Sequence, residues 1–378
     1  MTASGAGTSE PAVRPLLNTD VVSRLNRELE RSVLRARNGI RIVSGASRPT
    51  IGATPKDVIW RRDRAELWRY RGGQIRHDPP VLFVHSLVSR SYIMDLRPGN
   101  STVEFLLNEG FDVCMLDWGV PDERDAGNTI ETYVDDYLPS AIEALRRETG
   151  SDEVTLVGYC LGGTFAILYA AGHEEAAVRN LVLLASPMDY SEMGAMVGAV
   201  LDGRLDPEEL VDETGNVPAA ALYAAFFMQA PTAEIAHYAT LLENLWNDEF
   251  VEAWQAMAQW SREQVPFPGA ALRQIVAEFV RRNVLMTGRM RLNGREIDFA
   301  NVRGNVLNAV AERDKVVPLP AAEPASLLVG DPARRDELRL NGGHVTFFAG
   351  RHARRHTLPD LTKWLAEHSD ELDSPKER

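Results

Sequence analysis

The residues best suited to chemistry lie in the segment Gly158-Tyr159-Cys160-Leu161-Gly162. The apolar run 154–157 precedes it and a helical pattern over 164–171 follows, so we expect a strand, a tight turn and a helix. This is the G-x-S-x-G nucleophile-elbow pattern with cysteine in place of serine, and its glycines suit a turn that passes close to its neighbours. The positive end of the helix can stabilise a thiolate and an oxyanion. We predict that Cys160 is a covalent nucleophile; the alternative is a small buried apolar side chain.

An acid and a histidine follow the cysteine in the order that such a site uses. Residues 304–311 are typical of a buried strand, and Asp314 comes just after it. His344 lies in a glycine-flanked loop after a short strand candidate at 337–340. Taken singly, the acid reads as a turn residue and the histidine as a surface residue. The ordered set of three favours a catalytic triad in which His344 takes the proton of Cys160.

The strand candidate 81–85 leads into a segment that can complete an oxyanion hole. The first donor is predicted to be the N–H of Leu161, directly after the nucleophile, and the second that of Leu87 or Val88. Backbone donors leave no side-chain signature, so the choice between the two stays open. Among the other histidines, His85 is the nearest rival to His344 for the role of base.

Composition limits the class of protein. A formal net charge of −13 argues against broad nucleic-acid binding, because phosphate contacts need clustered lysine and arginine. The two cysteines, Cys114 and Cys160, suggest no disulfide framework and favour a reducing compartment. Residues 1–15 lack a signal-peptide pattern, and no apolar run is long enough to span a bilayer. We expect a cytoplasmic protein with no transmembrane segment, no metal site and no cofactor.

The order of the predicted elements indicates a mostly parallel central sheet flanked by helices. Helical patterns at 101–109, 130–148 and 164–172 alternate with strands, which is typical of crossover connections. A charged amphipathic helix is expected at 19–37. Strand candidates also occur at 57–60, 66–70, 81–85, 112–116, 154–158, 181–185 and 305–311.

Between residues 187 and 295 the pattern becomes helical, which in an α/β-hydrolase fold indicates a lid. Helices are expected at 218–230, 233–245 and 250–260. The aromatic residues among them fit either a lid–core contact, which is the commoner case, or an apolar substrate channel; they are Trp246, Trp254, Trp260 and Phe267. The predicted divisions are a flexible tail 1–18, a helix and linker 19–54, the α/β-hydrolase core in two parts 55–186 and 296–368, the lid 187–295, and a flexible tail 369–378.

Several segments resemble the polyhydroxyalkanoate synthases, and the resemblance runs from about residue 55 to 365. The segments are Gly158-Tyr159-Cys160-Leu161-Gly162-Gly163-Thr164, Tyr92-Ile93-Met94-Asp95-Leu96-Arg97-Pro98, Asp117-Trp118-Gly119, Ser186-Pro187-Met188-Asp189-Tyr190, 283–302 and 314–318. The short chain is most similar to the class III catalytic subunit. It departs from the pattern at Lys315, where many members have a histidine, and in the aromatic residues after His344.

The resemblance implies polymerisation of (R)-3-hydroxyacyl-coenzyme A into polyester, with release of coenzyme A as a product. Cys160 would carry the growing chain as a thioester, and His344 or Asp314 would help deprotonate the 3-hydroxyl of the next unit. A movable lid, a homodimer, an accessory synthase subunit and a location at polyester granules are implied in the same way. The same triad would also serve a thioesterase, a depolymerase or another acyltransferase. A non-catalytic granule protein would leave the triad unexplained.

A basic run after His344 is a candidate for the phosphates of coenzyme A, because arginine binds phosphate in bidentate fashion. It contains Arg351, Arg354 and Arg355. The alternative is a solvated surface run, which is the commoner case. Competing arginines occur in the predicted lid at Arg281, Arg282, Arg289 and Arg291.

Overall fold

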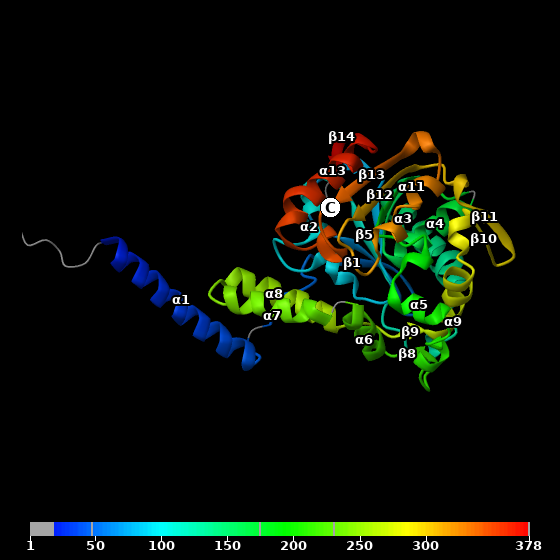
Figure 1. Cartoon of the computed structure of the whole chain (residues 1–378). Helices are drawn as coiled ribbons and strands as arrows, with labels where there is room; N and C mark the ends of the chain where they lie inside the picture. Colours follow the sequence, from blue (N-terminus) through cyan, green and yellow to red (C-terminus); the bar gives the residue numbers. More distant parts are fainter. Residues whose placement is uncertain (1–18, 47, 174, 230, 377–378) are drawn as a thin grey trace, which may run out of the picture.

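The computed structural model describes residues 19–46, 48–173, 175–229 and 231–376. The predicted tail 1–18 lies outside them. The body consists of a central sheet covered by helices on both faces, and one long helix projects from it (Figure 1). Among these residues no helix is long and apolar enough to cross a membrane. They also contain no cluster of three His, Cys, Asp or Glu side chains suited to a metal ion.

The central sheet has eight strands within the described residues, in the order β1-β2-β5-β4-β6-β7-β12-β13. Pairing is parallel from β5 to β13, whereas β1 and β2 are antiparallel additions at one edge. The strands are β1 Lys56–Arg62, β2 Ala65–Tyr70, β4 Val81–Val84, β5 Val113–Asp117, β6 Val154–Tyr159, β7 Val178–Leu184, β12 Asn305–Ala311 and β13 Arg335–Leu340. All the strands predicted from sequence are therefore present, with shifted ends.

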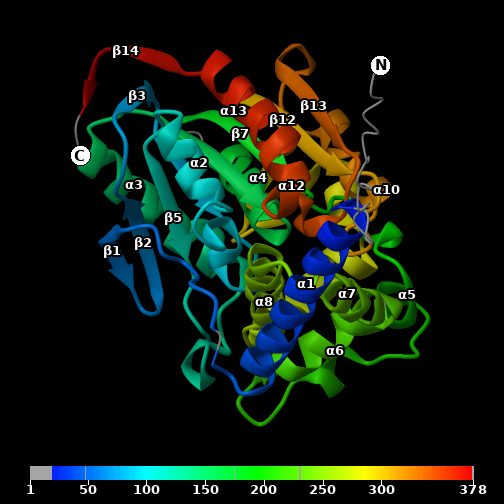
Figure 2. The ribbon, with the colours of Figure 1, turned by 90° about the vertical axis from the view of Figure 1, so that its left-hand side faces the viewer.

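Both faces of the sheet carry an apolar core, which explains the continuous apolar runs of its central strands. Every residue of β4 and β6 is buried. Helices α3 (Leu138–Thr149) and α4 (Leu161–Gly172) cover one face. Helices α2 (Thr102–Asn108) and α13 (Leu358–Glu367) cover the other (Figure 2).

The prediction of a flexible tail at 369–378 is wrong for most of that segment. Residues 370–376 form β14 (Asp370–Lys376), which pairs antiparallel with β3 (Ile75–Asp78). The strand is polar and mostly exposed, so it has none of the apolar alternation that marks a strand in a sequence. An ion pair adds to the backbone pairing, because the Arg179 guanidinium donates to Asp370 Oδ1 at 2.8 Å.

The segment between β7 and β12 is largely helical, as predicted. The expected helices are α6 (Ala219–Gln229), α7 (Pro231–Asn244) and α8 (Asp248–Arg262). We call these three helices the lid. A hairpin of β10 (Arg289–Leu292) and β11 (Arg295–Asp298) follows, so the boundary predicted after residue 295 falls inside β11.

The end of α8 and the residues just after it are hydrogen-bonded to the loop that follows β4. Side chains and backbone on both sides contribute, so the lid and this loop form one hydrogen-bonded unit. The contacts are Trp260 Nε1 to the Arg90 carbonyl (2.8 Å), the Tyr92 hydroxyl to Glu263 Oε2 (2.9 Å) and the Val265 N–H to the Val88 carbonyl (3.4 Å).

The N-terminal helix α1 (Thr19–Val43) extends past its predicted end at residue 37. It leaves the body at an angle and points away from the sheet (Figure 1). Its C-terminal half rests on the turn between α7 and α8, where the Asn38 side-chain amide donates to the Leu245 carbonyl and to Asp248, each at 2.8 Å. The Arg31 guanidinium lies 4.5 Å from the centre of the Trp246 ring.

Candidate active site

Cys160 lies at a sharp turn between β6 and α4. Its backbone has φ 54° and ψ −127°, a conformation that residues other than glycine rarely adopt. The carbonyl of Cys160 accepts from the Gly163 N–H at 2.9 Å, which closes the turn. The strand, tight turn and helix expected from the sequence are therefore present.

The glycines of this turn are required by close backbone approaches. A Cβ at Gly158 would lie 2.3 Å from the Gly163 Cα, and one at Gly162 would lie 2.1 Å from the Val84 carbonyl oxygen. A Cβ at Gly163 would meet the Ser186 hydroxyl at 1.7 Å. These distances exclude any other residue without movement of the backbone, and they hold the elbow against β4 and the end of β7.

Asp314 lies in the loop after β12 with a completely buried carboxylate. Its Oδ1 accepts the N–H groups of Val316 (2.8 Å) and Val317 (2.9 Å). Its Oδ2 lies 2.7 Å from His344 Nδ1. The backbone therefore fixes one carboxylate oxygen, and the other is aimed at the imidazole.

His344 follows β13 and is held between aromatic rings and the acid. Its ring centre lies 4.8 Å from that of Tyr159, and the Tyr159 ring packs edge-on against Phe348 at 4.7 Å. Phe347 and Phe348 are both buried, which accounts for the aromatic residues after the histidine. They form a wall of the core that supports the loop.

The pKa of His344 is raised to about 10. Burial alone would lower it, but the charge of Asp314, the hydrogen bond to that carboxylate and a side-chain hydrogen bond with Cys160 outweigh the effect of burial. Since Nδ1 faces Asp314, Nε2 is the nitrogen left for the thiol. The structure thus brings the three predicted residues together at the carboxyl edge of the parallel strands.

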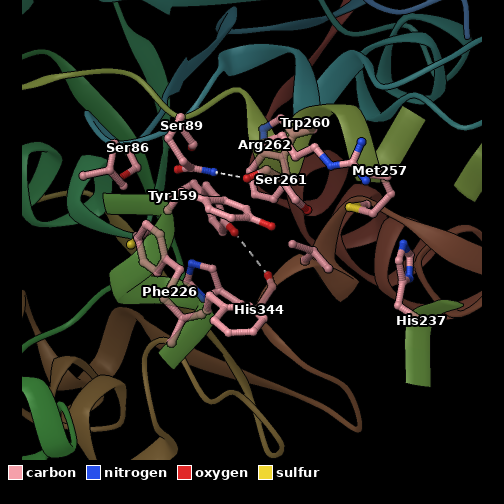
Figure 3. A pocket seen from close by; sticks show the side chains of 18 of the residues that line it. Ser86, Ser89, Tyr159, Phe226, His237, Met257, Trp260, Ser261, Arg262 and His344 are labelled. Carbon is pink, nitrogen blue, oxygen red and sulfur yellow. Dashed lines mark hydrogen bonds between the residues drawn. The ribbon is translucent and has the colours of Figure 1, made fainter. Parts of the chain in front are cut away.

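A pocket of about 360 Å³ opens above Cys160 and His344. Figure 3 shows core residues such as Ser86 and Tyr159 on one side and the lid residues Met257 and His237 on the other. Most of the lid side is apolar or aromatic. Its lining residues from α6 to α8 include Tyr223, Phe226, Phe227, Tyr238, Met257 and Trp260.

The predicted oxyanion donors lie next to this pocket. Leu161 is the first residue of α4, where N–H groups have no acceptor within the helix. Val88 lines the pocket, whereas Leu87 is 3% exposed and is not part of the lining. The geometry favours Val88 over Leu87 as the second donor.

Two family models match the chain. One is described as alpha/beta hydrolase fold and covers residues 79–350. The other is described as Poly-beta-hydroxybutyrate polymerase (PhaC) N-terminus and covers residues 42–106.

Curated relatives agree with the second model. The Poly(3-hydroxyalkanoate) polymerase subunit PhaC of Thiocystis violacea is 32% identical over 84% of this chain and 90% of its own length. That of Haloferax mediterranei is 31% identical over 86% of this chain and 66% of its own length. This chain belongs to the poly(3-hydroxyalkanoate) polymerase family. The predicted family, and with it an acyltransferase-type enzyme, is confirmed.

Two solved structures have a fold similar to that of this polymerase-family chain. A bromoperoxidase from Bacillus anthracis aligns with a TM-score of 0.51 at 13% identity, over 83% of this chain and all of its own. An esterase from Thermogutta terrifontis aligns with a TM-score of 0.50 at 15% identity, over 86% and 99%. Together with the family model, they confirm the predicted α/β-hydrolase fold.

The predicted phosphate-binding arginines lie apart from the pocket lining of the polymerase-family chain. Arg351, Arg354 and Arg355 are exposed on the helical segment after His344. In the predicted lid, Arg282 pairs with Glu278 and Arg289 with Asp298, each at 2.9 Å. Arg281 and Arg291 do not line the pocket in the described part of the chain either.

Sequence reasoning missed Arg262, which does line the pocket. It lies at the end of α8 and donates to the Tyr238 hydroxyl at 2.7 Å. The signal was an arginine in the predicted lid, two residues beyond the end of the helix predicted at 250–260. Trp260 takes part both in a lid–core contact and in the apolar lining. Its indole N–H donates to the Arg90 carbonyl, and its side chain lines the pocket.

His85 is not placed to act as the base. It is 3% exposed and lies outside the pocket lining, with Nε2 4.0 Å from Asp117 Oδ2. Burial lowers the pKa of this imidazole more than Asp117 raises it. It is a core histidine beside the loop that carries Val88.

Proposed function

We propose that this chain is a polyhydroxyalkanoate synthase that polymerises (R)-3-hydroxyacyl-coenzyme A and releases coenzyme A. The observation that carries the proposal is a cysteine on the nucleophile elbow that lines the same pocket as His344, in a member of the polymerase family. Asp314 in turn holds the imidazole at 2.7 Å. No cofactor takes part, because the coenzyme A thioester is itself the substrate.

Acylation begins when His344 takes the thiol proton and the Cys160 sulfur attacks the thioester carbonyl. The N–H groups of Leu161 and Val88 stabilise the oxyanion of the tetrahedral intermediate. The carbon–sulfur bond to coenzyme A then breaks, and His344 returns the proton to the departing thiolate. The acyl group is left on Cys160 as a new thioester.

Elongation repeats the transfer with an alcohol as the attacking group. His344, oriented by Asp314, accepts the proton of the 3-hydroxyl of the next acyl-coenzyme A, whose oxygen attacks the acyl-thioester on Cys160. The ester bond forms as the carbon–sulfur bond to Cys160 breaks, and His344 returns the proton to the Cys160 sulfur. The lengthened chain is then a coenzyme A thioester, and a further acylation step transfers it back to Cys160 and releases coenzyme A. A thiol suits this cycle because transfer between two sulfurs is nearly balanced. An acyl ester on serine would be less readily transferred.

The lid wall supports the choice of substrate class. Its apolar and aromatic lining suits an acyl chain and a growing polyester, and a volume of about 360 Å³ is in the range of small-molecule pockets. Arg351, Arg354 and Arg355 are proposed to attract the phosphates of coenzyme A from outside the pocket. Arg262 competes for that role from the lid.

We propose a homodimer that works in the cytoplasm at the surface of polyester granules, together with an accessory subunit. The word "subunit" in the relatives' names supports a second chain. Exposed apolar side chains on α6 and α7 support contact with an apolar polymer. They are Phe227 (41% exposed), Met228 (70%), Ile235 (71%) and Leu242 (66%).

The decisive experiment is to incubate the purified chain with (R)-3-hydroxybutyryl-coenzyme A and to follow both products. Free coenzyme A together with insoluble polymer is expected. Coenzyme A with free 3-hydroxybutyrate would instead identify a thioesterase, and neither product, even at one equivalent per chain, would contradict acylation. The Cys160→Ala variant is the control for release that does not depend on the nucleophile.

A further inference from the structure

The pocket that contains Cys160 is lined by two residues with a buried polar atom that has no hydrogen-bond partner. These atoms are the hydroxyl oxygen of Ser86 and the amide oxygen Oε1 of Gln264. Within the described part of the chain, no other lining residue has a side-chain oxygen or nitrogen that is both buried and unpartnered. Buried polar atoms in folded proteins are almost always paired, because an unpaired one costs free energy. Two such atoms in one pocket wall indicate a polar group of a ligand.

Ser86 lies on the core side of the pocket, directly after β4 (Figure 3). It is 1% exposed. A Cβ at Gly162 would lie 2.6 Å from the His85 carbonyl oxygen, so the peptide that joins His85 to Ser86 lies against the elbow. The backbone that carries Ser86 is thus packed on the turn that carries Cys160.

Gln264 reaches the same region from the segment after α8. Its Nε2 donates to the Ser261 carbonyl at 2.9 Å, which leaves Oε1 as a free acceptor. The Val265 N–H donates to the Val88 carbonyl at 3.4 Å, so Gln264 adjoins the loop after β4. Ser86 and Gln264 therefore both flank Val88, the proposed second oxyanion donor.

The acyl unit of the proposed substrate has one polar group besides its thioester carbonyl. This group is the 3-hydroxyl, two carbons beyond the carbonyl whose oxygen the N–H groups of Leu161 and Val88 would hold. A hydroxyl donates one hydrogen bond and accepts others. The 3-hydroxyl can donate to Gln264 Oε1 and accept from the Ser86 hydroxyl, while the hydrocarbon part of the unit contacts the apolar lid wall.

We infer that Ser86 and Gln264 form a subsite for the 3-hydroxyl and select 3-hydroxyacyl-coenzyme A over acyl-coenzyme A that lacks this group. The inference rests on the proposed function and adds to it the residues that recognise the hydroxyl. An acyl group without the hydroxyl leaves both polar atoms unpaired, and a site built to bond a hydroxyl discriminates strongly against such an analogue.

Acylation by two substrates tests the subsite. With the chain in excess, the first coenzyme A should be released from (R)-3-hydroxybutyryl-coenzyme A at least about tenfold faster than from butyryl-coenzyme A. Ser86→Ala and Gln264→Leu should each lower this ratio about three- to tenfold, by slowing the hydroxylated substrate. A general defect in folding or in the triad slows both substrates alike and does not move the ratio. An unchanged ratio in either variant would refute the two-residue subsite.

Ser186→Ala is the matched control. The Ser186 hydroxyl is also buried without a partner among the described residues, but Ser186 does not line the pocket. Its removal should leave the ratio of the wild type. A fall as large as that of Ser86→Ala would mean that Ser86 acts through the packing of the elbow and does not contact the substrate.

Binding to the Cys160→Ala variant separates the subsite from the reaction. In calorimetry, (R)-3-hydroxybutyryl-coenzyme A should bind about three- to tenfold more tightly than butyryl-coenzyme A, and adding Ser86→Ala should remove most of the difference. Equal affinities, or no binding of either, would refute the subsite even in a chain that makes polymer. Conversely, a chain that prefers the hydroxylated substrate but forms no polymer would retain the subsite and refute the proposed polymerase.

Discussion

The two walls of the pocket are built in different ways. On the core wall, Tyr159 and Ser86 are 1% exposed, and the glycine contacts of the elbow leave no room for change. On the lid wall, Phe227 and Tyr238 are each 41% exposed, and α6 has no buried residue. We therefore expect the core wall to determine the type of reaction and the lid wall to determine which substrates reach Cys160.

The strongest test of the core wall is the nucleophile. Cys160→Ala should lower acylation by ~10³-fold or more, because the covalent intermediate is lost, while the unfolding free energy changes little. Release of the first equivalent of coenzyme A is the measurement. Cys160→Ser should be nearly inactive, because an alkoxide forms less readily than a thiolate.

Cys114→Ala is the matched control for this variant. Cys114 is buried in β5, away from the pocket, so its loss should affect stability and leave acylation intact. Inactivity of Cys114→Ala together with an active Cys160→Ala would overturn the assignment.

The acid and base come next. His344→Ala should abolish release of the first coenzyme A. Asp314→Asn keeps the shape of the side chain but loses the charge that orients the imidazole, so we expect a loss of roughly 10²–10⁴-fold. Single-turnover acylation and steady-state polymerisation separate the two half-reactions. Equal loss in both would make Asp314 an orienter, and loss in elongation alone would place it in the second step.

The pH dependence of stability provides a third test of the core wall. The folded-state pKa of His344, about 10, lies above its ordinary value of 6.5, so its stabilising contribution is complete below pH 6.5 and is lost as the pH rises through 10. The advantage of the wild type over His344→Gln in urea unfolding should therefore shrink from pH 7 to pH 10. An advantage that stays constant over this interval would contradict the raised pKa.

On the lid wall, a smaller and more selective effect is expected. Phe227→Ala removes part of the apolar lining and should raise KM for the acyl-coenzyme A about three- to tenfold with little change in kcat. Met228→Ala is the control, since Met228 is 70% exposed and is not part of the lining. A fall in kcat alone for Phe227→Ala would contradict the expectation that the lid wall affects substrate binding and not the chemical step.

The smallest effect is expected outside both walls. Replacing Arg351, Arg354 and Arg355 by glutamine should raise KM for acyl-coenzyme A about two- to fivefold and weaken its salt dependence, because exposed charges contribute little. Activity toward a short thioester without the nucleotide should not change. An unaffected KM would favour Arg262 as the phosphate contact, and Arg262→Gln should then raise KM for acyl-coenzyme A.

The elbow was predictable because its signal is local. Glycines around Cys160 between a strand and a helix leave few other conformations, and the order of Asp314 and His344 follows from the topology. The lid lining was not predictable, since residues such as Phe227 look the same whether they pack on a core or face a pocket. Strand β14 lacks apolar periodicity, so only its pairing with β3 reveals it.

The hydrogen bonds that join the end of α8 to the loop after β4 have a consequence for engineering. Residues 260–265 and 88–92 meet through Trp260, Glu263 and Val265, and the same loop supplies Val88. A lid taken from a relative would form different hydrogen bonds with this loop and would move Val88, the proposed second oxyanion donor. Chimeras designed to accept longer acyl chains should therefore exchange both segments together, because a lid exchanged alone would change the rate along with the range.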